Sequence, residues 1–319
     1  MKKILIGIIT ASAFFALPAF GATDSFGITQ LNPTSGRIWV SNWANGAPRT
    51  IQSGDRDPYD SYNLFVARGD GKTTINGSGI ATLTGSAPRM YLYNAAKEKI
   101  WGDVEITFYA KRISEAQTLS YQGFTAAAKT DHTNDTTDIC GTRGYFGRML
   151  YDGRMDFEKE INHHADDGYV QFGSVKPWTS LPKNQWIGYK FIARDDGSSV
   201  KFELYRDLTG GTNGGDWKLM TSATDSGQYG AGHTPCAAGI NPAQVLTGSN
   251  VSVYVRNDGL GQAQYKWFSV REIGAVSTPP TATSTPVNPN RGQMLLIIDG
   301  IISSLQGIIN LLAQLKTLI

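Results

Sequence analysis

YFGRMLYDGRMDFEKEI, residues 145–161, carries the clearest β-hairpin signal in the chain. Asp152-Gly153 lies between two runs in which apolar and polar side chains alternate. Because Asp-Gly tolerates the positive φ angles of a type I′ turn, the sequence predicts a two-residue hairpin loop. A loop of that length fixes the register, and the opposite pairs are Tyr151–Arg154, Met149–Asp156, Gly147–Glu158 and Tyr145–Glu160.

The two faces of this hairpin differ, since side chains alternate across a strand. One face is apolar and is expected to lie against the core: Phe146, Leu150, Met155, Phe157 and Ile161. The other carries the residues that we expect to line a carbohydrate site: Tyr145, Tyr151, Arg154, Asp156, Glu158 and Glu160. Carboxylates at spacing two repel one another, whereas aromatic planes suit sugar rings. The alternative is a solvated acidic face that pairs with basic residues.

The first 21 residues have the pattern of a secretory signal peptide. Lys2 and Lys3 precede an apolar run at residues 4–17, and Ala19-Phe20-Gly21 places small residues at the cleavage positions. The run is too short for a typical membrane-spanning helix. We therefore expect a mature chain that begins near residue 22 in an oxidising compartment: extracellular, at the cell surface or in the periplasm.

The chain has two cysteines, Cys140 and Cys236. An even pair in a secreted chain predicts one disulfide, and the alternative is a pair of buried thiols. Such a long loop is expected to stabilise the fold by about 4 kcal/mol when closed. The net charge of +2 and the absence of a basic cluster give no indication of nucleic-acid binding.

Short strand patterns separated by turn residues fill the sequence from residue 24 to residue 275. No stretch before residue 290 shows a helical period. The best strand patterns lie at residues 64–67, 73–75, 79–83, 89–93, 104–110, 121–128, 169–173, 186–193, 200–206, 217–221, 251–256 and 265–273. Gly69-Asp70-Gly71 and Asp195-Asp196-Gly197 are expected to be turns. This spacing predicts an all-β fold, a two-sheet antiparallel jelly-roll sandwich over residues 22–276.

The C-terminal part has a different composition and period. Residues 277–292 are rich in Pro and Thr and are expected to form an extended linker. Residues 293–319 place apolar side chains at steps of three and four, with polar ones opposite: the apolar seam is Ile298, Ile301, Leu305, Ile308, Leu312, Leu315 and Ile319. The pattern predicts an amphipathic helix that forms a homo-oligomer of three or four chains, or attaches the protein to a membrane surface.

Three phrases carry a family likeness: residues 186–190 (WIGYK), 202–205 (FELY) and 266–273 (KWFSVREI). They resemble secreted domains of the concanavalin A-like lectin/glucanase superfamily, over most of residues 50–275. That superfamily has a β jelly roll and includes lectins, laminarinase-like hydrolases, and alginate and glucuronan lyases. The resemblance implies a jelly-roll domain with a polysaccharide or other glycan as its partner.

The functional motifs of that superfamily match in part. Laminarinase-like hydrolases carry Glu-x-Asp-x-Glu, and residues 156–160 (DFEKE) keep the carboxylate spacing but exchange the first two identities. Residues 200–205 match the Tyr-x-Lys-x-Gly-x-Tyr strand of alginate lyases only loosely, and their Gln-x-His motif is absent. The resemblance therefore leaves cleavage undecided.

Two histidine-containing stretches are further candidates. His163 could act as a general base or join Glu160 as a metal ligand, against the alternative of an exposed polar loop. His132 lies among Asp131, Asp135 and Asp138, where a structural calcium ion is conceivable although no twelve-residue calcium loop is present. We expect no other cofactor. Arg68-Gly69-Asp70 looks like an adhesion tripeptide, but a turn explains it better.

These observations predict a secreted polysaccharide-binding domain presented on a helical tail. The first alternative is an enzyme of the same fold, with Glu158, Glu160 and His163 as catalytic candidates. It would cut by hydrolysis, or by β-elimination with His163 or a tyrosine taking the proton and Arg154 neutralising a uronate. The second alternative is a structural surface protein without a sugar site.

Overall fold

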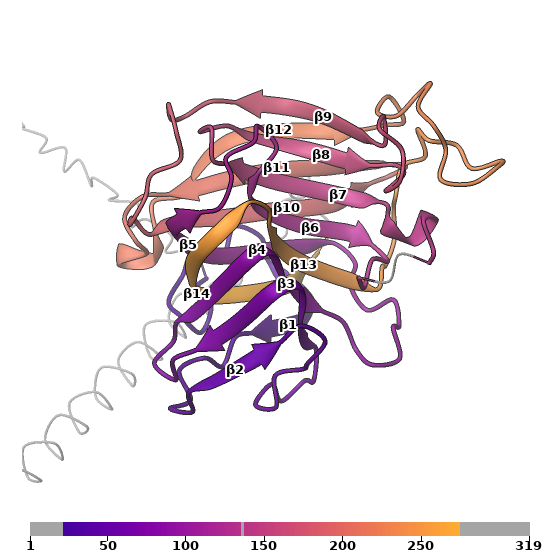
Figure 1. The fold of residues 1–319 in the computed structure, drawn as a ribbon. Helices are drawn as coiled ribbons and strands as arrows, with labels where there is room; N and C mark the ends of the chain where they lie inside the picture. Colours follow the sequence, from indigo (N-terminus) through magenta and orange to yellow (C-terminus); the bar gives the residue numbers. More distant parts are fainter. Residues whose placement is uncertain (1–21, 135–136, 275–319) are drawn as a thin grey trace, which may run out of the picture. The chain divides into compact units, whose positions relative to one another are not determined.

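The computed structural model describes residues 22–134 and 137–274, and this part of the chain is built from strands (Figure 1). The predicted signal peptide, the linker at 277–292 and the amphipathic helix at 293–319 lie outside the described residues. The strands are β1 (Thr34–Val40), β2 (Arg49–Gln52), β3 (Phe65–Ile75), β4 (Ala81–Leu92), β5 (Val104–Glu115), β6 (Gly123–Thr130), β7 (Gly144–Leu150), β8 (Met155–Glu160), β9 (Tyr169–Val175), β10 (Ile187–Asp196), β11 (Ser199–Asp207), β12 (Lys218–Asp225), β13 (Ser252–Asn257) and β14 (Leu260–Ile273). No helix in this part is long and apolar enough to cross a membrane.

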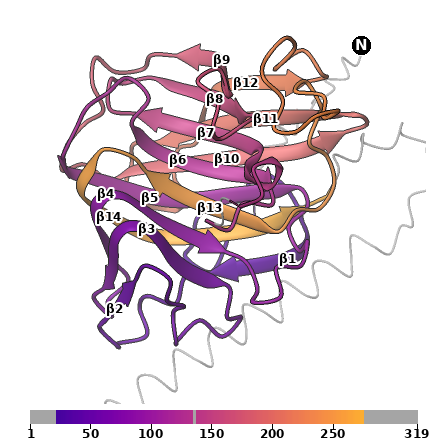
Figure 2. The same cartoon turned by 45° about the vertical axis from the view of Figure 1, so that its right-hand side comes forward.

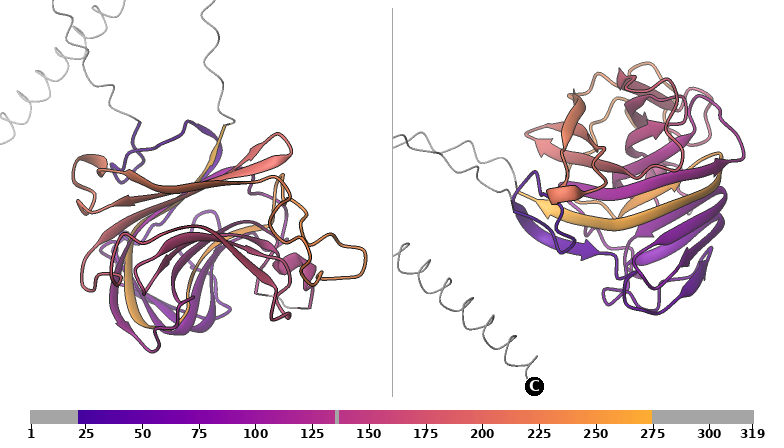
Figure 3. Two further views of the ribbon diagram at one scale, coloured as in Figure 1. Left: turned by 90° about the horizontal axis from the view of Figure 1, so that it is seen from above. Right: turned by 90° about the vertical axis from the view of Figure 1, so that its left-hand side faces the viewer.

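The strands pair antiparallel along one path, β12-β11-β10-β5-β14-β4-β13-β6-β7-β8-β9, with β3 on β4, β2 on β3 and β1 on β14. The long strand β14 pairs with both β4 and β5, and there the path folds over into two layers (Figures 2 and 3). We call β2, β3, β4, β13 and β6 to β9 the front layer, and β1, β14, β5 and β10 to β12 the back layer. The predicted two-sheet antiparallel sandwich is confirmed.

Aromatic side chains fill the space between the layers. Phe108 of β5 stacks on Tyr189 of β10 with ring centroids 4.8 Å apart, and Phe157 of β8 lies 5.6 Å from Phe202 of β11. Each strand sends alternate residues inward, so both layers contribute to one core. The opposite face of each layer is left for other uses.

The expected turn at Gly69-Asp70-Gly71 is wrong, because β3 runs through it as one strand. The pairing with β4 shifts between Asp70 and Lys72, and Gly69 and Gly71 have φ angles of +74° and +123°. Glycine adopts such angles readily, so the chain absorbs its turn-like residues as a β-bulge. The adhesion-like tripeptide therefore lies within a paired strand.

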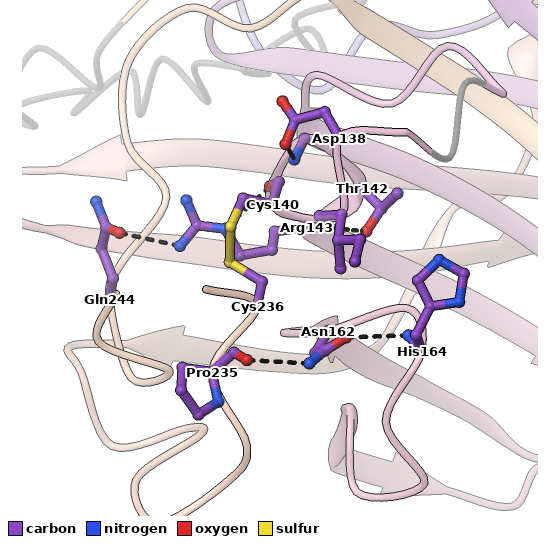
Figure 4. The surroundings of a disulfide bond; sticks show 11 residues. Asp138, Cys140, Thr142, Arg143, Asn162, His164, Pro235, Cys236 and Gln244 are labelled. Atoms are coloured by element: carbon purple, nitrogen blue, oxygen red, sulfur yellow. Dashed lines mark hydrogen bonds between the residues drawn. A yellow bond between two sulfur atoms is a disulfide. The ribbon is translucent and has the colours of Figure 1, made fainter. Parts of the chain in front are cut away.

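The predicted disulfide between Cys140 and Cys236 is present, with the Cα atoms 5.1 Å apart (Figure 4). Next to it, the Nε of Arg143 donates a hydrogen bond to the Cys140 carbonyl at 3.1 Å, and the side chain of Asn162 donates to the Pro235 carbonyl at 3.0 Å. The disulfide thus fastens the long loop between β12 and β13 to the start of β7. The alternative of two free thiols is excluded.

A buried charge cluster lies on the outer face of the back layer. The carboxylate of Glu105 accepts hydrogen bonds from Lys190 at 2.9 Å and Arg271 at 2.5 Å, and from the Leu31 backbone N–H at 3.2 Å. Although burial raises it, the pKa of Glu105 is lowered overall by Lys190 and Arg271. Burial lowers the pKa of Lys190, which opposes the pair, but two cations on one carboxylate favour ionised Glu105. The cluster ties the N-terminal segment to the sandwich.

Candidate functional site

The central hairpin forms at the predicted place, but its register differs by one residue. The loop contains three residues, Tyr151 to Gly153, and the Leu150 N–H donates to the Arg154 carbonyl at 2.8 Å. Gly153 has a φ of +88°, which suits the left-handed position of a three-residue loop. The opposite pairs are Gly144–Glu160, Phe146–Glu158, Arg148–Asp156 and Met149–Met155. A slip of one residue moves every side chain of β7 to the other face.

The predicted places of Tyr145 and Tyr151 are therefore wrong, since both side chains are in the core. Tyr145 is 1% exposed and donates a hydrogen bond to Asp225 at 2.6 Å. Tyr151 is 2% exposed and packs edge-on against Phe124. Phe146, predicted to face the core, is instead part of a small cluster on the outer face of the front layer. These two tyrosines cannot stack on a sugar.

Arg148 lies opposite Asp156, where the predicted register placed Met149. Its Nε and Nη2 donate to Asp156 at 2.7 and 3.0 Å, and its Nη1 donates to Glu158. Arg148, Asp156 and Glu158 are 1%, 0% and 4% exposed. Asp156 and Glu158 thus pair with a basic residue, as the alternative of a solvated acidic face expected, but they are buried rather than solvated. Arg154 lies at the hairpin end, 2.7 Å from Asp152 and 3.5 Å from Asp156.

Glu160 and His163 do come together. The Nδ1 of His163 lies 2.6 Å from Oε1 of Glu160, and the Tyr169 hydroxyl lies 3.3 Å from the same nitrogen. Glu160 is fully buried, and its Oε2 has no hydrogen-bond partner among the described residues. The predicted contact between Glu160 and His163 therefore exists, and it leaves one buried carboxylate oxygen available.

The described ranges contain no group of three His, Cys, Asp or Glu side chains able to hold a metal ion. At the suggested calcium site, Asp131 pairs with Lys99 at 3.0 Å and accepts the Val251 N–H at 3.0 Å. Asp138 accepts the Gly141 N–H at 3.1 Å. Asp135 lies outside the described residues. Asp131 thus ties this loop to Lys99 and Val251, while Asp138 makes a contact within the loop.

A pocket of about 450 Å³ opens on the outer face of the front layer. It is lined by Tyr121, Arg148, Glu158, Asp166, Tyr169, Gln171, Arg256 and Asp258. Among the six residues predicted to bind carbohydrate, Glu158 alone lines it. Across the pairing of β8 with β9, Gln171 lies opposite Glu158 and Tyr169 opposite Glu160. Since side chains alternate along a strand, Tyr169 and Gln171 share one face, and the correct hairpin register would have placed both on the outer face of the sheet beside Glu158 and Glu160.

The charges of this pocket are coupled through Glu158. Burial raises the pKa of Glu158, although Arg148 and Arg256 act in the opposite direction. The pKa of Arg256 is raised despite burial, through Asp258, Tyr254 and Glu158. Arg256 is 2.8 Å from Asp258 but 3.8 Å from Glu158, so its charge acts mainly on Asp258. Burial therefore outweighs the attraction of Arg256 for the Glu158 carboxylate. Glu158 thus retains a proton more readily than an ordinary carboxyl group.

Tyr169 contributes a hydroxyl rather than a base. Burial and then the charge of Glu160 raise the pKa of Tyr169 well above its usual value. It is therefore protonated near neutral pH and can donate or accept a hydrogen bond. The pocket as a whole offers two aromatic faces, one amide, two guanidinium groups and three carboxyl groups, of which Glu158 is the one with the raised pKa.

No family model matches the chain, and no curated protein matches it. Solved structures similar to it include the exoplasmic/lumenal domain of VIP36 with Ca2+ and Man3GlcNAc bound, at 12% identity over 75% of this chain and 92% of that one, with a TM-score of 0.41. A Bacillus subtilis protein of unknown function with a galectin-like fold matches at 13% identity, over 73% of this chain and 98% of that one, with a TM-score of 0.39. Peanut lectin matches at 11% identity, over 72% and 99%, with a TM-score of 0.37.

Proposed function

We propose that this chain is a secreted polysaccharide-binding protein that takes its glycan in the Tyr121–Tyr169 pocket. The pocket itself is the observation that supports this function: about 450 Å³ on the outer face of the front layer, with two tyrosines beside polar side chains. Binding sites for small ligands combine apolar walls with a few placed polar groups in this way.

The pocket residues suit the chemistry of a sugar ring. Tyr121 is 50% exposed, so its ring is free to cover the apolar face of a pyranose. Gln171 is exposed and offers both a donor and an acceptor to ring hydroxyl groups. Arg256 adds donors, and Glu158 accepts or donates according to its protonation. A sugar hydroxyl needs both kinds of partner, and the pocket supplies both.

Tyr121→Ala gives a sharp test, because the half-exposed ring makes little contribution to the core. The mature full chain is first assayed on a glycan array, and the best polymer is then titrated against the variant by calorimetry. We expect affinity to fall by about 0.5–1.5 kcal/mol, the range for one aromatic contact. Tyr62→Ala, at another tyrosine that is 56% exposed, is the matched control and should bind like wild type. Equal affinity of Tyr121→Ala and wild type would refute this pocket as the site.

Cleavage of the bound polymer is the second candidate function. The raised pKa of Glu158 suits a general acid, and the His163 contact orients the carboxylate of Glu160. Alternate side chains of one strand project about 6–7 Å apart, which exceeds the spacing of retaining glycosidases and overlaps the lower end of the inverting range. In this candidate water adds across the glycosidic bond and Glu158 protonates the departing oxygen; Glu160 is fully buried and does not line the pocket, so Glu158 is the carboxyl group that reaches the sugar.

Hydrolysis suits this site better than β-elimination. Elimination beside a uronate needs a positive group to neutralise the carboxylate. Arg148 already pairs with Asp156 and Glu158, and Arg256 with Asp258. An assay for new reducing ends, run beside an absorbance assay for unsaturated products, tests this candidate. Glu158→Gln should abolish turnover and leave binding measurable. If wild type released neither product, cleavage would be refuted and polysaccharide binding would stand as the proposed function.

The ends of the chain complete the proposal. The first 21 residues would direct secretion, and the disulfide fits an oxidising compartment. Residues 293–319 would join several copies, so that several pockets engage one polymer at once. A glycan array with no bound sugar would favour the third reading, a structural surface protein.

A further inference from the structure

A second pocket of about 350 Å³ shares no residue with the first. It lies where the loop after β1, the loop before β4, the start of β10 and the middle of β14 meet. Its lining residues are Phe26, Ser41, Trp43, Ala44, Ser78, Gly79, Ile80, Trp186, Lys266 and Trp267. Three of the seven tryptophans of the chain are thus gathered at one cavity, and no acidic side chain lines it.

The backbone is distorted to bring Trp267 to this pocket. Trp267 has a φ of +54°, and the pairing of β14 with β5 shifts between Lys266 and Ser269. A bulky residue rarely adopts a left-handed conformation, and such strain is concentrated at functional sites. A β-bulge re-aims the side chains beside it. This bulge keeps an indole ring at the cavity wall that a regular strand would place elsewhere.

Two lysines lie against the indole rings. The Nζ of Lys266 is 3.6 Å from the ring centroid of Trp267 and 5.0 Å from that of Trp186. The Nζ of Lys111 is 4.8 Å from the ring centroid of Trp186. The pocket therefore combines aromatic walls with one lining ammonium group, that of Lys266, and a second, that of Lys111, against the ring of Trp186.

These lysines differ from the lysines buried in the sandwich. Lys129, Lys159 and Lys190 each pair with an Asp or Glu at 2.7–2.9 Å. In the part of the chain that the structure describes, no such ion pair involves Lys111 or Lys266, and Lys266 donates only to the Gly210 carbonyl at 3.2 Å. Burial lowers the pKa of Lys266; the charge of Asp207, which does not line the pocket, acts in the opposite direction, and repulsion by Lys111 adds a smaller lowering. The cavity thus holds a positive charge whose balancing anion is absent from its walls.

We propose that this pocket binds an acidic sugar residue, with Lys266 facing its carboxylate and the indole rings of Trp186 and Trp267 against its ring. A cationic ligand is disfavoured by two ammonium groups, and a purely apolar one would leave them without a counter-charge. The Ser41 and Ser78 hydroxyls are partners for sugar hydroxyls. The Trp43 Nε1–H is buried and has no acceptor among the described residues, so a donor is also available.

Intrinsic tryptophan fluorescence of the mature full chain reports on binding directly. The probes are oligogalacturonates and their fully methyl-esterified forms, in which a methyl group on each carboxylate removes its charge, with alginate and hyaluronan oligosaccharides as further uronates. We expect at least one uronate to change the emission. The neutral ester should bind at least about 10-fold more weakly than the acid, and added salt should weaken the binding of the acid. No response to any of the three uronates, or equal binding of acid and ester, would overturn the proposal.

Substitutions locate the binding. Lys266→Gln should weaken the uronate about 10-fold, as expected for a charge-assisted contact, and Lys266→Arg should retain most of the affinity. Lys111→Gln tests the same charge at a second position and should give a smaller loss. Lys218→Gln, at an exposed lysine of β12, is the control. Tyr121→Ala should leave this response intact, which separates the two pockets. Wild-type affinity in both Lys266→Gln and Lys111→Gln would refute the assignment.

Discussion

Two isosteric substitutions on β8 should have different effects on stability. Asp156 and Glu158 lie on the same face, and both contact Arg148. Asp156 receives two hydrogen bonds from that guanidinium, at 2.7 and 3.0 Å, while Glu158 receives one. Asp156→Asn removes the carboxylate that accepts two hydrogen bonds from the buried guanidinium group of Arg148. Glu158→Gln leaves that partner in place.

The magnitudes follow from these contacts. Removing one partner of a buried ion pair costs about 3–5 kcal/mol, and we expect about 3 kcal/mol for Asp156→Asn because Glu158 remains. Glu158→Gln loses one charged hydrogen bond but also removes a carboxylate that burial disfavours, so we expect about 1 kcal/mol. The same Glu158→Gln should weaken glycan binding by about 1–3 kcal/mol.

Urea denaturation of both variants, followed by calorimetric titration with the polymer found on the array, measures the two effects separately. Asp156→Asn should lose stability, and Glu158→Gln should lose affinity with most of its stability retained. If the two variants were equally unstable, or Asp156→Asn were the milder one, the assignment of Asp156 as the main partner of Arg148 would be wrong.

The pH dependence gives an independent check on Glu158. A carboxyl group whose pKa is raised by folding stabilises the native state most below its unfolded pKa, near 4.5, and loses this contribution as pH rises through its folded pKa. The destabilisation caused by Glu158→Gln should therefore be larger at pH 4 than at pH 7. A larger effect at pH 7 would mean that the folded protein lowers the pKa of Glu158.

Two further predictions concern other parts of the chain. Glu105→Gln leaves Lys190 and Arg271 without their buried anion and should lower the free energy of unfolding by about 3–5 kcal/mol in urea; a loss below about 1 kcal/mol would contradict the cluster. Removing residues 293–319 should convert a trimer or tetramer into a monomer with an intact sandwich, by light scattering at matched concentrations. A full-length monomer in detergent-free buffer would refute the predicted oligomer. Flotation of that monomer with lipid vesicles would instead indicate membrane attachment.

The sequence predicted what depends on local pattern and missed what depends on one turn and on distant strands. The sandwich, the disulfide and the hairpin position follow from alternation, cysteine count and turn residues. The loop at Asp152-Gly153 has three residues rather than two, and both lengths suit a glycine with positive φ. That single residue decided the faces of Tyr145 and Arg148. Glu158 and the Glu160–His163 contact depend on β8 and its following loop, so they did not depend on this choice.

The other residues of the pocket could not have been predicted from the local sequence pattern, whatever register the hairpin had. Arg256 reaches Glu158 because β13 lies between β4 and β6, which aligns Arg256, Thr125, Arg148 and Asp156 in one row across four strands. Thr125 and Arg256, the extremes in sequence, are 131 positions apart (256 − 125), and the strand order alone brings them together. The cross-strand neighbours differ along this row: Arg148 lies between Thr125 and Asp156, whereas Arg256 lies between Thr125 and Arg89, which in turn lies opposite Arg68. Because like charges opposite one another repel, the three arginines give this end of the row an excess of positive charge, which Glu158 and Asp258 beside Arg256 offset in part.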